Sequence, residues 1–268
     1  MNTKKFVSPE IENSTIEELT RQLLKANNEL KHLQEEREMM FANISHDLRA
    51  PMTAIRSALD LFFSEEDPSG EEMRKTLELI NRRAKTLEAL VNDMYYLYKV
   101  SSGTKRSEFE EIEAIPFLEE YYFDLQINSK YDNFKLELEI EPDSECLLNV
   151  DVQEMVRVLD NLYSNAARYS GEGSVITLKA GKSVDGKNLN IIIKDNGCGI
   201  PEEKLPYIFM RTYTVSDSRT PASNDQGSGL GLAIVKSIVE KHGGTITCES
   251  KPGVGTEFLI CLPISLSS

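Results

Sequence analysis

Residues 41–55 read FANISHDLRAPMTAI, a stretch in which apolar side chains recur at helical spacing around a histidine, an acid and a proline. The stretch overlaps the end of a longer apolar series, from Leu19 to Ile44, whose members follow one another at intervals of four and three with only Arg37 interrupting. Such a heptad seam predicts a long helix that packs against other helices. Because proline removes a helical hydrogen bond and clashes with the preceding turn, Pro51 predicts a bend close to His46.

A second apolar series with the same spacing runs from Met73 to Tyr98. Between the two series, residues 64–70 read SEEDPSG, which supplies helix-stop and turn residues. The sequence therefore predicts two long helices joined as a hairpin, each with an apolar stripe that one hairpin cannot fully bury. Pairing with a second copy into a four-helix bundle would bury both stripes. The alternative is a monomeric hairpin that packs on a second domain of its own chain.

After about residue 103 the apolar pattern changes from helical to alternating. Strands are predicted at 135–140, 175–180, 189–193, 245–248 and 256–262, and helices at 115–128, 152–170 and 230–242. Helices segregated over a mixed sheet predict an α/β sandwich, so the fold class is α+β, a helical hairpin followed by a sandwich. We expect a coiled coil over 1–34, a helical domain over 35–102, a hinge over 103–107 and a second domain over 108–265.

Composition agrees with a folded protein of two ordinary domains, because 40% of the 268 residues are hydrophobic and 28% are charged. The formal net charge of -14 opposes binding to nucleic acid or to an anionic membrane surface, since phosphates would be repelled. No apolar run approaches the roughly 18 residues of a membrane span. The N-terminus also lacks the apolar core of a signal peptide, so we expect a cytoplasmic chain without a membrane span.

The four cysteines show neither a Cys-x-x-Cys pair nor histidines at zinc-ligand spacing, so they predict reduced thiols. Cys198 lies inside a glycine-rich segment, where a space-filling residue and a redox-sensitive thiol are the alternatives. Of the three histidines, His32 and His242 have no ligand partners nearby in the sequence.

His46 differs from the other two because Asp47 follows it directly. An imidazole can attack phosphorus through an unprotonated ring nitrogen. A carboxylate on the other nitrogen fixes the tautomer and stabilises the developing positive charge. The same two residues could also simply be exposed on a solvated helix face, so the rest of the chain has to decide whether they are catalytic.

Four later segments are rich in asparagine, aspartate or glycine. They are DNLYSNAARYS at 160–170, DNGCGI at 195–200, GSGLGL at 227–232 and GVGTEF at 253–258. In the first, Asn161 and Asn165 are four apart and lie on one helix face. The amide oxygen of Asn165 can bind Mg²⁺, which needs few protein ligands when phosphate oxygens supply the rest. Arg168 is placed to meet a phosphate, and Tyr169 can pack on a base.

The second segment places Asp195 directly after a predicted strand. A carboxylate there can accept a hydrogen bond from the exocyclic amine of adenine, while Gly197 and Gly199 let the backbone approach the ring. Asp-Asn-Gly is also a common turn sequence, so the alternative is that these residues only form a turn.

The third segment runs through Gly227, Gly229 and Gly231 into an apolar helix, so its amides and the helix start can form an anion cradle. The run is not a dinucleotide-binding fingerprint, because no βαβ unit surrounds it. Residues 212–226, just before it, are polar without an apolar period and predict a mobile lid.

In this order the five segments resemble the boxes of a two-component sensor histidine kinase. The segment around His46 resembles the phospho-acceptor box of the dimerising helical domain. The other four resemble the asparagine and glycine boxes of the GHKL (Bergerat) ATP-binding fold. The resemblance covers about residues 35–263. It implies ATP-dependent autophosphorylation of His46, transfer to an aspartate of a response-regulator receiver domain, and a homodimer.

The resemblance also implies roles for single residues and for ligands. ATP and Mg²⁺ are the implied ligands, with Asp47 as the base, Asn165 as the metal ligand and Asp195 as the adenine-selecting residue. Thr256 of the last box joins the nucleotide site. No nucleic-acid partner is implied, and the chain would be cytoplasmic, either whole or as the cytoplasmic part of a membrane-bound sensor.

The chain departs from the family at two places. Ala50 stands where the family usually has Thr or Asn, and a methyl group cannot orient water, so phosphatase activity toward a regulator is in doubt. Residues 209–214 read FMRTYT, where Thr212 and Thr214 replace an aromatic anchor and a basic residue, and Arg211 or Arg219 could compensate. The rival functions are a GHKL ATPase of another kind, and a weakly active dimeric module that binds regulators.

Overall fold

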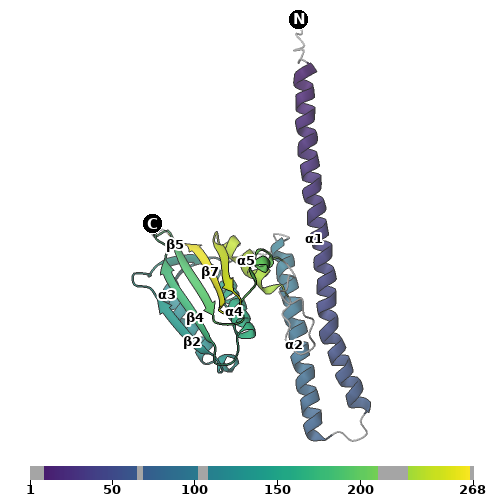
Figure 1. Ribbon diagram of the computed structural model, residues 1–268, viewed down its shortest axis with the longest axis vertical. Helices are drawn as coiled ribbons and strands as arrows, with labels where there is room; N and C mark the ends of the chain where they lie inside the picture. The colour runs from purple at the N-terminus through teal and green to yellow at the C-terminus, as the bar shows by residue number, and fades with distance from the viewer. Residues whose placement is uncertain (1–8, 65–68, 102–107, 211–228, 266–268) are drawn as a thin grey trace.

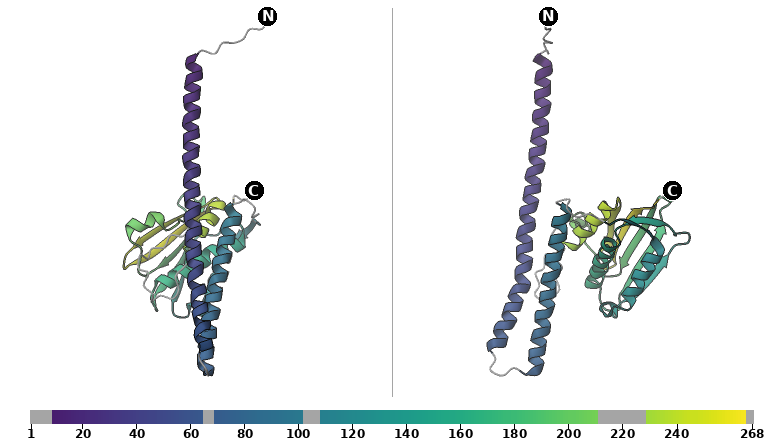
Figure 2. Two further views of the ribbon diagram at one scale, coloured as in Figure 1. Left: turned by 90° about the vertical axis from the view of Figure 1, so that its right-hand side faces the viewer. Right: turned by 180° about the vertical axis from the view of Figure 1, so that it is seen from behind.

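The computed structural model describes residues 9–64, 69–101, 108–210 and 229–265 (Figure 1). Its first part is a hairpin of two long helices, α1 (Pro9–Ser64) and α2 (Gly70–Ser101), as the two apolar stripes predicted. In both Figure 1 and Figure 2 the N-terminal part of α1 extends beyond the end of α2. The predicted hinge at 103–107 lies outside the described residues.

Local interactions explain where α2 begins. The Ser69 amide and hydroxyl donate to the Glu72 carboxylate at 2.9 and 2.6 Å, and the Glu72 amide donates back to the Ser69 hydroxyl at 3.3 Å. This reciprocal capping box satisfies amides that the first turn would otherwise leave unpaired. In α1 the helix continues through Pro51, which is buried, and a bend at that position stays a prediction.

The second part is a mixed five-stranded sheet with three helices packed on one face (Figures 1 and 2). The strand order is β2-β4-β5-β7-β6, with β2 parallel to β4 and the other pairs antiparallel. The elements are α3 (Ala114–Gln126), α4 (Val152–Tyr169), α5 (Gly231–Lys241), β2 (Lys135–Ile140), β4 (Val175–Lys182), β5 (Asn188–Asp195), β6 (Thr245–Lys251) and β7 (Gly255–Pro263). The predicted α/β sandwich is therefore confirmed.

The two faces of the sheet differ as its sequence alternation requires. In β5 the side chains of Leu189, Ile191 and Ile193 are buried in the core. Burying each of these contributes about 1.5–3 kcal/mol. The residues that alternate with them are more exposed, and the last of these, Lys194, pairs with Glu257 on β7 at 3.2 Å. One apolar and one charged face explain why helices cover a single side.

A second, two-stranded sheet was not predicted. β1 (Glu110–Glu113) pairs antiparallel with β3 (Leu147–Val150). Three of the four β1 residues are glutamates, which have low strand propensity, so local pattern could not identify this strand. Two short 3-10 helices, η1 (Ser129–Tyr131) and η2 (Glu202–Tyr207), were also not predicted.

A polar joint attaches the sandwich to α2. The Tyr96 hydroxyl and the Lys241 ammonium both donate to Oε1 of the buried Glu154 at 3.0 Å. Arg157 pairs with Asp93 at 2.5 Å and lies over the Tyr96 ring, 4.2 Å from its centroid. The C-terminal part of α2 therefore packs on the second domain of its own chain, as the alternative to the four-helix bundle predicted.

His242, at the end of α5, belongs to the same region. Its Nε2 accepts from the Asp151 amide at 3.0 Å, and its Nδ1 lies 2.7 Å from the Ile238 carbonyl oxygen, so Nδ1–H is the donor there. A buried neutral imidazole thus ties the start of α4 to the end of α5.

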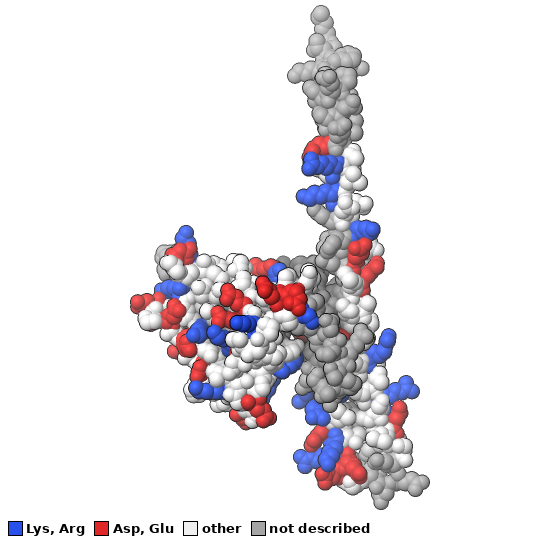
Figure 3. All heavy atoms as spheres, viewed as in Figure 1, with Lys and Arg blue, Asp and Glu red and all other residues white. Residues whose placement is uncertain are grey.

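The surface carries charges of both signs. On the face shown in Figure 3, acidic and basic side chains are interspersed over hairpin and sandwich, without one large basic patch. Among the described residues, no helix combines the length and apolar character needed to cross a bilayer.

Candidate functional site

The predicted phospho-acceptor lies on the surface of α1. The His46 side chain is 65% exposed, and its Nδ1 lies 3.3 Å from Oδ1 of Asp47. Neighbouring residues on a helix point in different directions, so this contact is at the long end of hydrogen-bond range. When Nδ1–H donates to the carboxylate, the lone pair of the neutral ring is on Nε2, which can act as a nucleophile.

Asp47 is better shielded than its neighbour, with 33% of its side chain exposed. Burial raises the pKa of this carboxyl, while the hydrogen bond and charge of His46 act in the opposite direction. A carboxylate with a raised pKa is a more effective proton acceptor, which suits the role expected of Asp47.

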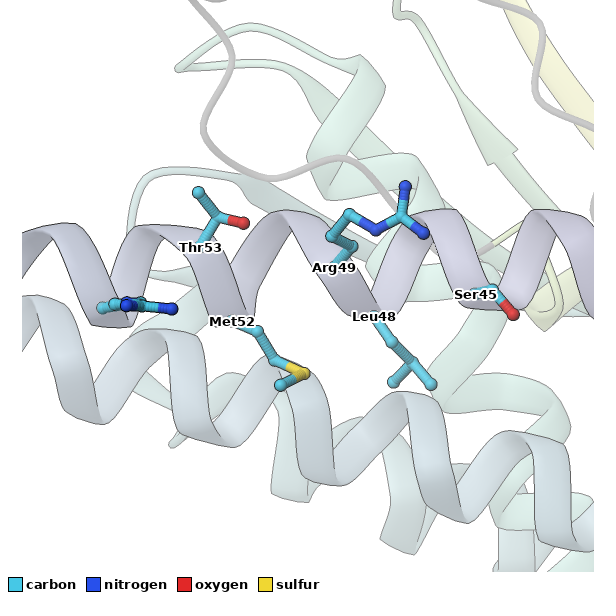
Figure 4. A pocket seen from close by; sticks show the side chains of 6 residues that line it. Ser45, Leu48, Arg49, Met52 and Thr53 are labelled. Atoms are coloured by element: carbon cyan, nitrogen blue, oxygen red, sulfur yellow. The ribbon is translucent and has the colours of Figure 1, made fainter.

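A shallow hollow of about 420 Å³ lies along α1 next to the acceptor. It is lined by Ser45, Leu48, Arg49, Met52, Thr53 and Arg56. In Figure 4, Leu48 and Met52 point toward α2, whereas Arg49 and Thr53 point away from it. Ala50 is exposed on the same helix, one turn beyond His46.

The asparagine box lies on the C-terminal half of α4. The Asn161 amide donates to the Arg157 carbonyl oxygen at 2.8 Å. A Cβ at Gly231 would come within 2.6 Å of Asn161 Oδ1, so this side chain is packed against the start of α5. Asn165, one turn on, is half-buried, and its side chain makes no hydrogen bond within the described part of the chain. Its amide oxygen is available to a ligand.

The residues at the end of α4 are accessible. Arg168 is exposed and Tyr169 is 50% exposed, so both side chains can reach a ligand beside the helix.

Asp195 is a buried carboxylate at the end of β5, with 7% of the residue exposed. Its Oδ1 accepts from the Gly197 amide at 2.8 Å, and its strand partner in β7 is Thr256. Burial raises the pKa of Asp195, while the amides of Gly197 and Thr256 and the Ser170 hydroxyl oppose that shift. The Thr256 hydroxyl lies 3.0 Å from that of Ser250.

The first glycine box is held between two other segments. The Cys198 amide donates to the Tyr169 carbonyl oxygen at 3.0 Å, and its carbonyl oxygen accepts from the Gly253 amide at 2.8 Å. Gly199 has φ of +70°, and a Cβ there would lie 2.1 Å from the Lys251 carbonyl oxygen. The close packing of this chain's own backbone therefore already requires glycine, and a role beside a base stays a prediction.

The last glycines of the predicted anion cradle precede and begin α5. Gly229 has φ of +63°, and the residue before the helix, Leu230, supplies no side-chain cap. A helix start without a side-chain cap suits an anion. Gly227, the predicted lid at 212–226, and the positions Arg211, Thr212, Thr214 and Arg219 lie outside the described residues.

The structure thus gathers most of the predicted nucleotide residues at one end of the sandwich, around the ends of α4 and β5 and the start of α5. It does not bring His46 to them, since α2 lies between α1 and the sandwich in Figures 1 and 2. Sequence reasoning missed Ser170 as a neighbour of Asp195. Its place directly after Tyr169, within the first nucleotide segment, was the available signal.

Comparisons with known families agree with this arrangement. The sequence model of the His Kinase A (phospho-acceptor) domain matches residues 36–103. The model of the histidine kinase-, DNA gyrase B- and HSP90-like ATPases matches residues 150–266.

Solved structures share the fold. The histidine kinase AdeS of Acinetobacter baumannii has a TM-score of 0.62 at 22% identity, with 82% of this chain and 98% of that chain covered. The histidine kinase ThkA, solved in complex with the response regulator protein TrrA, has a TM-score of 0.65 at 23% identity, with coverages of 87% and 65%.

Curated relatives are closer in sequence. The sensor histidine kinase WalK of Bacillus subtilis (strain 168) is 32% identical over 240 residues, which are 88% of this chain and 38% of WalK, so the chain spans well under half of that relative. The sensor histidine kinase YcbM of the same organism is 33% identical over 226 residues, covering 83% of this chain and 70% of YcbM. The chain therefore belongs to the two-component sensor histidine kinases.

Proposed function

We propose that this chain is an ATP-dependent protein histidine kinase that phosphorylates His46 and passes the phosphoryl group to an aspartate of a response-regulator receiver domain. The observation that carries the proposal is the exposed His46 ring, whose Nδ1 faces Asp47 at 3.3 Å. This arrangement leaves Nε2 open to a large substrate, while a carboxylate holds the opposite nitrogen.

The reaction follows from that geometry. Nε2 of His46 attacks the γ-phosphorus of ATP, a nitrogen–phosphorus bond forms, and the bond to the β-phosphate oxygen breaks as ADP leaves. Asp47 accepts the hydrogen bond of Nδ1–H and stabilises the positive charge that develops on the ring. Positioning of the two reactants provides most of the rate enhancement in such a transfer.

The end of the sandwich that gathers the predicted nucleotide residues fits a magnesium nucleotide. Asn165 offers a half-buried amide oxygen without a hydrogen bond in the described residues, and Arg168 is exposed one turn further along α4. No group of three acidic, histidine or cysteine side chains within the described ranges could hold a metal alone, which suits an ion that takes phosphate and water ligands. Mg²⁺ held by Asn165 would neutralise phosphate charge. Asp195 would accept from the adenine amine.

Exposed apolar residues support a homodimer. Leu23, Leu30 and Leu77 are 71%, 66% and 58% exposed on the hairpin, although all three belong to the heptad seams. A second copy packed along both helices would cover them in a four-helix bundle.

Incubation of the chain with γ-labelled ATP tests the proposal. The parent should acquire label that is lost in acid and kept in base, as expected for phosphohistidine. His46→Gln should bind ATP with unchanged affinity and acquire no label, and His32→Gln on the same helix should label normally. Acid-labile label on His46→Gln would refute the assignment, because a glutamine side chain cannot act as this nucleophile.

The same assay separates the rival functions. A GHKL ATPase of another kind would hydrolyse ATP without labelling itself, and it would not need the phospho-acceptor domain matched at residues 36–103. A parent chain that binds ATP and never acquires label would instead be the weakly active regulator-binding module.

A further inference from the structure

Ser170 lies directly after α4 and close to Asp195. It is the C-cap of that helix, with φ of -107° and ψ of 148°, so the chain leaves the helix in an extended conformation. The preceding Tyr169 carbonyl oxygen accepts from the Cys198 amide at 3.0 Å. Backbone hydrogen bonding therefore fixes the end of α4 against the turn that follows Asp195.

Three polar groups converge on Gly197. A Cβ added there would lie 2.5 Å from the Tyr169 carbonyl oxygen, 2.7 Å from Ser170 Oγ and 2.9 Å from Asp195 Oδ1. The hydroxyl and the carboxylate thus approach the same backbone position, and the absence of a side chain at Gly197 makes that approach possible.

The Ser170 hydroxyl is buried and makes no hydrogen bond of regular geometry in the described part of the chain. Buried hydroxyls in native proteins nearly always have a partner. The Asp195 carboxylate is the acceptor beside this one, since the Ser170 hydroxyl already opposes the rise that burial causes in the pKa of Asp195. The Asp195 carboxylate already interacts with two backbone amides, those of Gly197 and Thr256. The Ser170 hydroxyl is a side-chain donor that lies close to the same carboxylate.

We propose that Ser170 is a positioning residue for Asp195: on nucleotide binding its hydroxyl donates to the carboxylate, keeps it ionised, and so sets the preference for adenine over guanine. The inference rests on the proposed function, in which Asp195 reads the base. An ionised carboxylate accepts from the adenine amine and repels the keto oxygen of guanine. A protonated carboxyl could instead donate to that oxygen, so losing Ser170 should weaken the discrimination.

Cys248 on β6 is a titratable neighbour of Asp195. Burial, followed by the charges of Asp195 and Glu249, raises the pKa of Cys248 on β6 to about 12, so this thiol stays protonated at neutral pH. Because burial raises the pKa of Asp195 and the hydroxyl opposes that shift, removing the hydroxyl should raise the pKa further. ATP affinity should then begin to fall at a higher pH, since a protonated carboxyl is a weaker acceptor for the amine than a carboxylate.

The test measures equilibrium binding of MgATP and MgGTP to the whole chain between about pH 5 and 8. Ser170→Ala and the similarly sized Ser170→Cys should each weaken ATP binding by about tenfold and lower the ratio of ATP affinity to GTP affinity. The pH below which ATP affinity falls should rise by about one unit in both variants. Ser144→Ala is the matched control, because the Ser144 hydroxyl is also buried without a partner in the described residues. Ser144 follows the C-terminal end of β2, whereas Asp195 is aligned, through β4, with the start of β2. The control residue therefore lies away from Asp195.

Asp195→Asn distinguishes a failure of the inference on Ser170 from a failure of the proposed adenine role of Asp195. If Asp195→Asn loses the preference for adenine while both Ser170 variants bind like the parent at every pH, the inference on Ser170 is wrong and the proposed function stands. If Asp195→Asn keeps the preference, the adenine role of Asp195 is wrong, and the inference on Ser170 is overturned with it. Thermal unfolding of each variant shows that the compared proteins are folded.

Discussion

Asp47 shares its helix turn with the reactive imidazole, and its contact with Nδ1 is long at 3.3 Å. The contact matters most when the ring becomes positively charged, because a charge-assisted hydrogen bond is stronger than a neutral one. The carboxylate should therefore contribute more to the transition state than to the resting structure.

Asp47→Asn should keep the fold and ATP affinity and slow autophosphorylation by about 10²-fold or more, the range for a positioned acid–base group. Single-turnover labelling measures the rate without a contribution from product release. Asp60→Asn, a change of an exposed acid on the same helix, is the control. An unchanged rate for Asp47→Asn would make Asp47 an ordinary surface residue.

Ala50 bears on the hydrolysis of the phosphorylated regulator. It is exposed one turn beyond His46, where a hydroxyl could orient water against an aspartyl phosphate. We expect the parent to phosphorylate its regulator and dephosphorylate it poorly.

Ala50→Thr should accelerate loss of label from purified phospho-regulator in the presence of ADP, with autophosphorylation changed no more than a few-fold. The site is an exposed helix position, so the stability cost should stay under about 1 kcal/mol. Rapid dephosphorylation by the parent would show that another residue orients the water.

The helices α2, α4 and α5 meet in the polar joint around Glu154, and this contact decides how the sandwich sits on the hairpin. Glu154 is 1% exposed and accepts from groups on both other helices, Tyr96 and Lys241. Removing a buried partner costs more than removing an exposed one, because the remaining groups lose their hydration without compensation.

Glu154→Gln should lower the free energy of unfolding of the sandwich by about 1.5–3 kcal/mol, since Lys241 would lose its charged acceptor. Urea denaturation followed by circular dichroism measures the change. Glu240→Gln removes an exposed pair with Lys236 and should cost under about 0.5 kcal/mol. Equal effects of the two changes would mean that the joint carries little stability.

The whole molecule has a long helix whose N-terminal part extends beyond its hairpin partner (Figure 1). An exposed apolar seam of this length is costly in water and is typical of helices that pair between chains. The joint to the sandwich occupies only the C-terminal part of α2, so most of the seam stays available to a second copy.

The parent should have a solution mass of twice 30.2 kDa by light scattering. Leu77→Glu should shift the chain toward the monomer mass, because a charge would be buried at the interface of the bundle. Glu78→Gln, a neighbouring exposed residue, should leave the mass unchanged. A monomeric parent would contradict the dimer, and a dimeric Leu77→Glu would place Leu77 outside the interface.

Sequence alone determined the features that depend on local pattern. The heptad spacing predicted both hairpin helices, the alternation at 135–140 predicted the strand β2, and the adjacent His46 and Asp47 predicted their own contact. Each of these rests on residues close in the chain, whose relative positions follow from the geometry of one helix or strand.

Only the tertiary structure decided which distant groups meet. The pairing of Glu110 with Val150, the packing of Asn161 on Gly231, and the approach of Ser170 to Asp195 join segments that periodicity describes separately. An apolar stripe tells which face of an element is buried, but it does not identify the element that covers it. Nor does it show which buried polar atoms find partners, since that depends on the final packing of all the elements together.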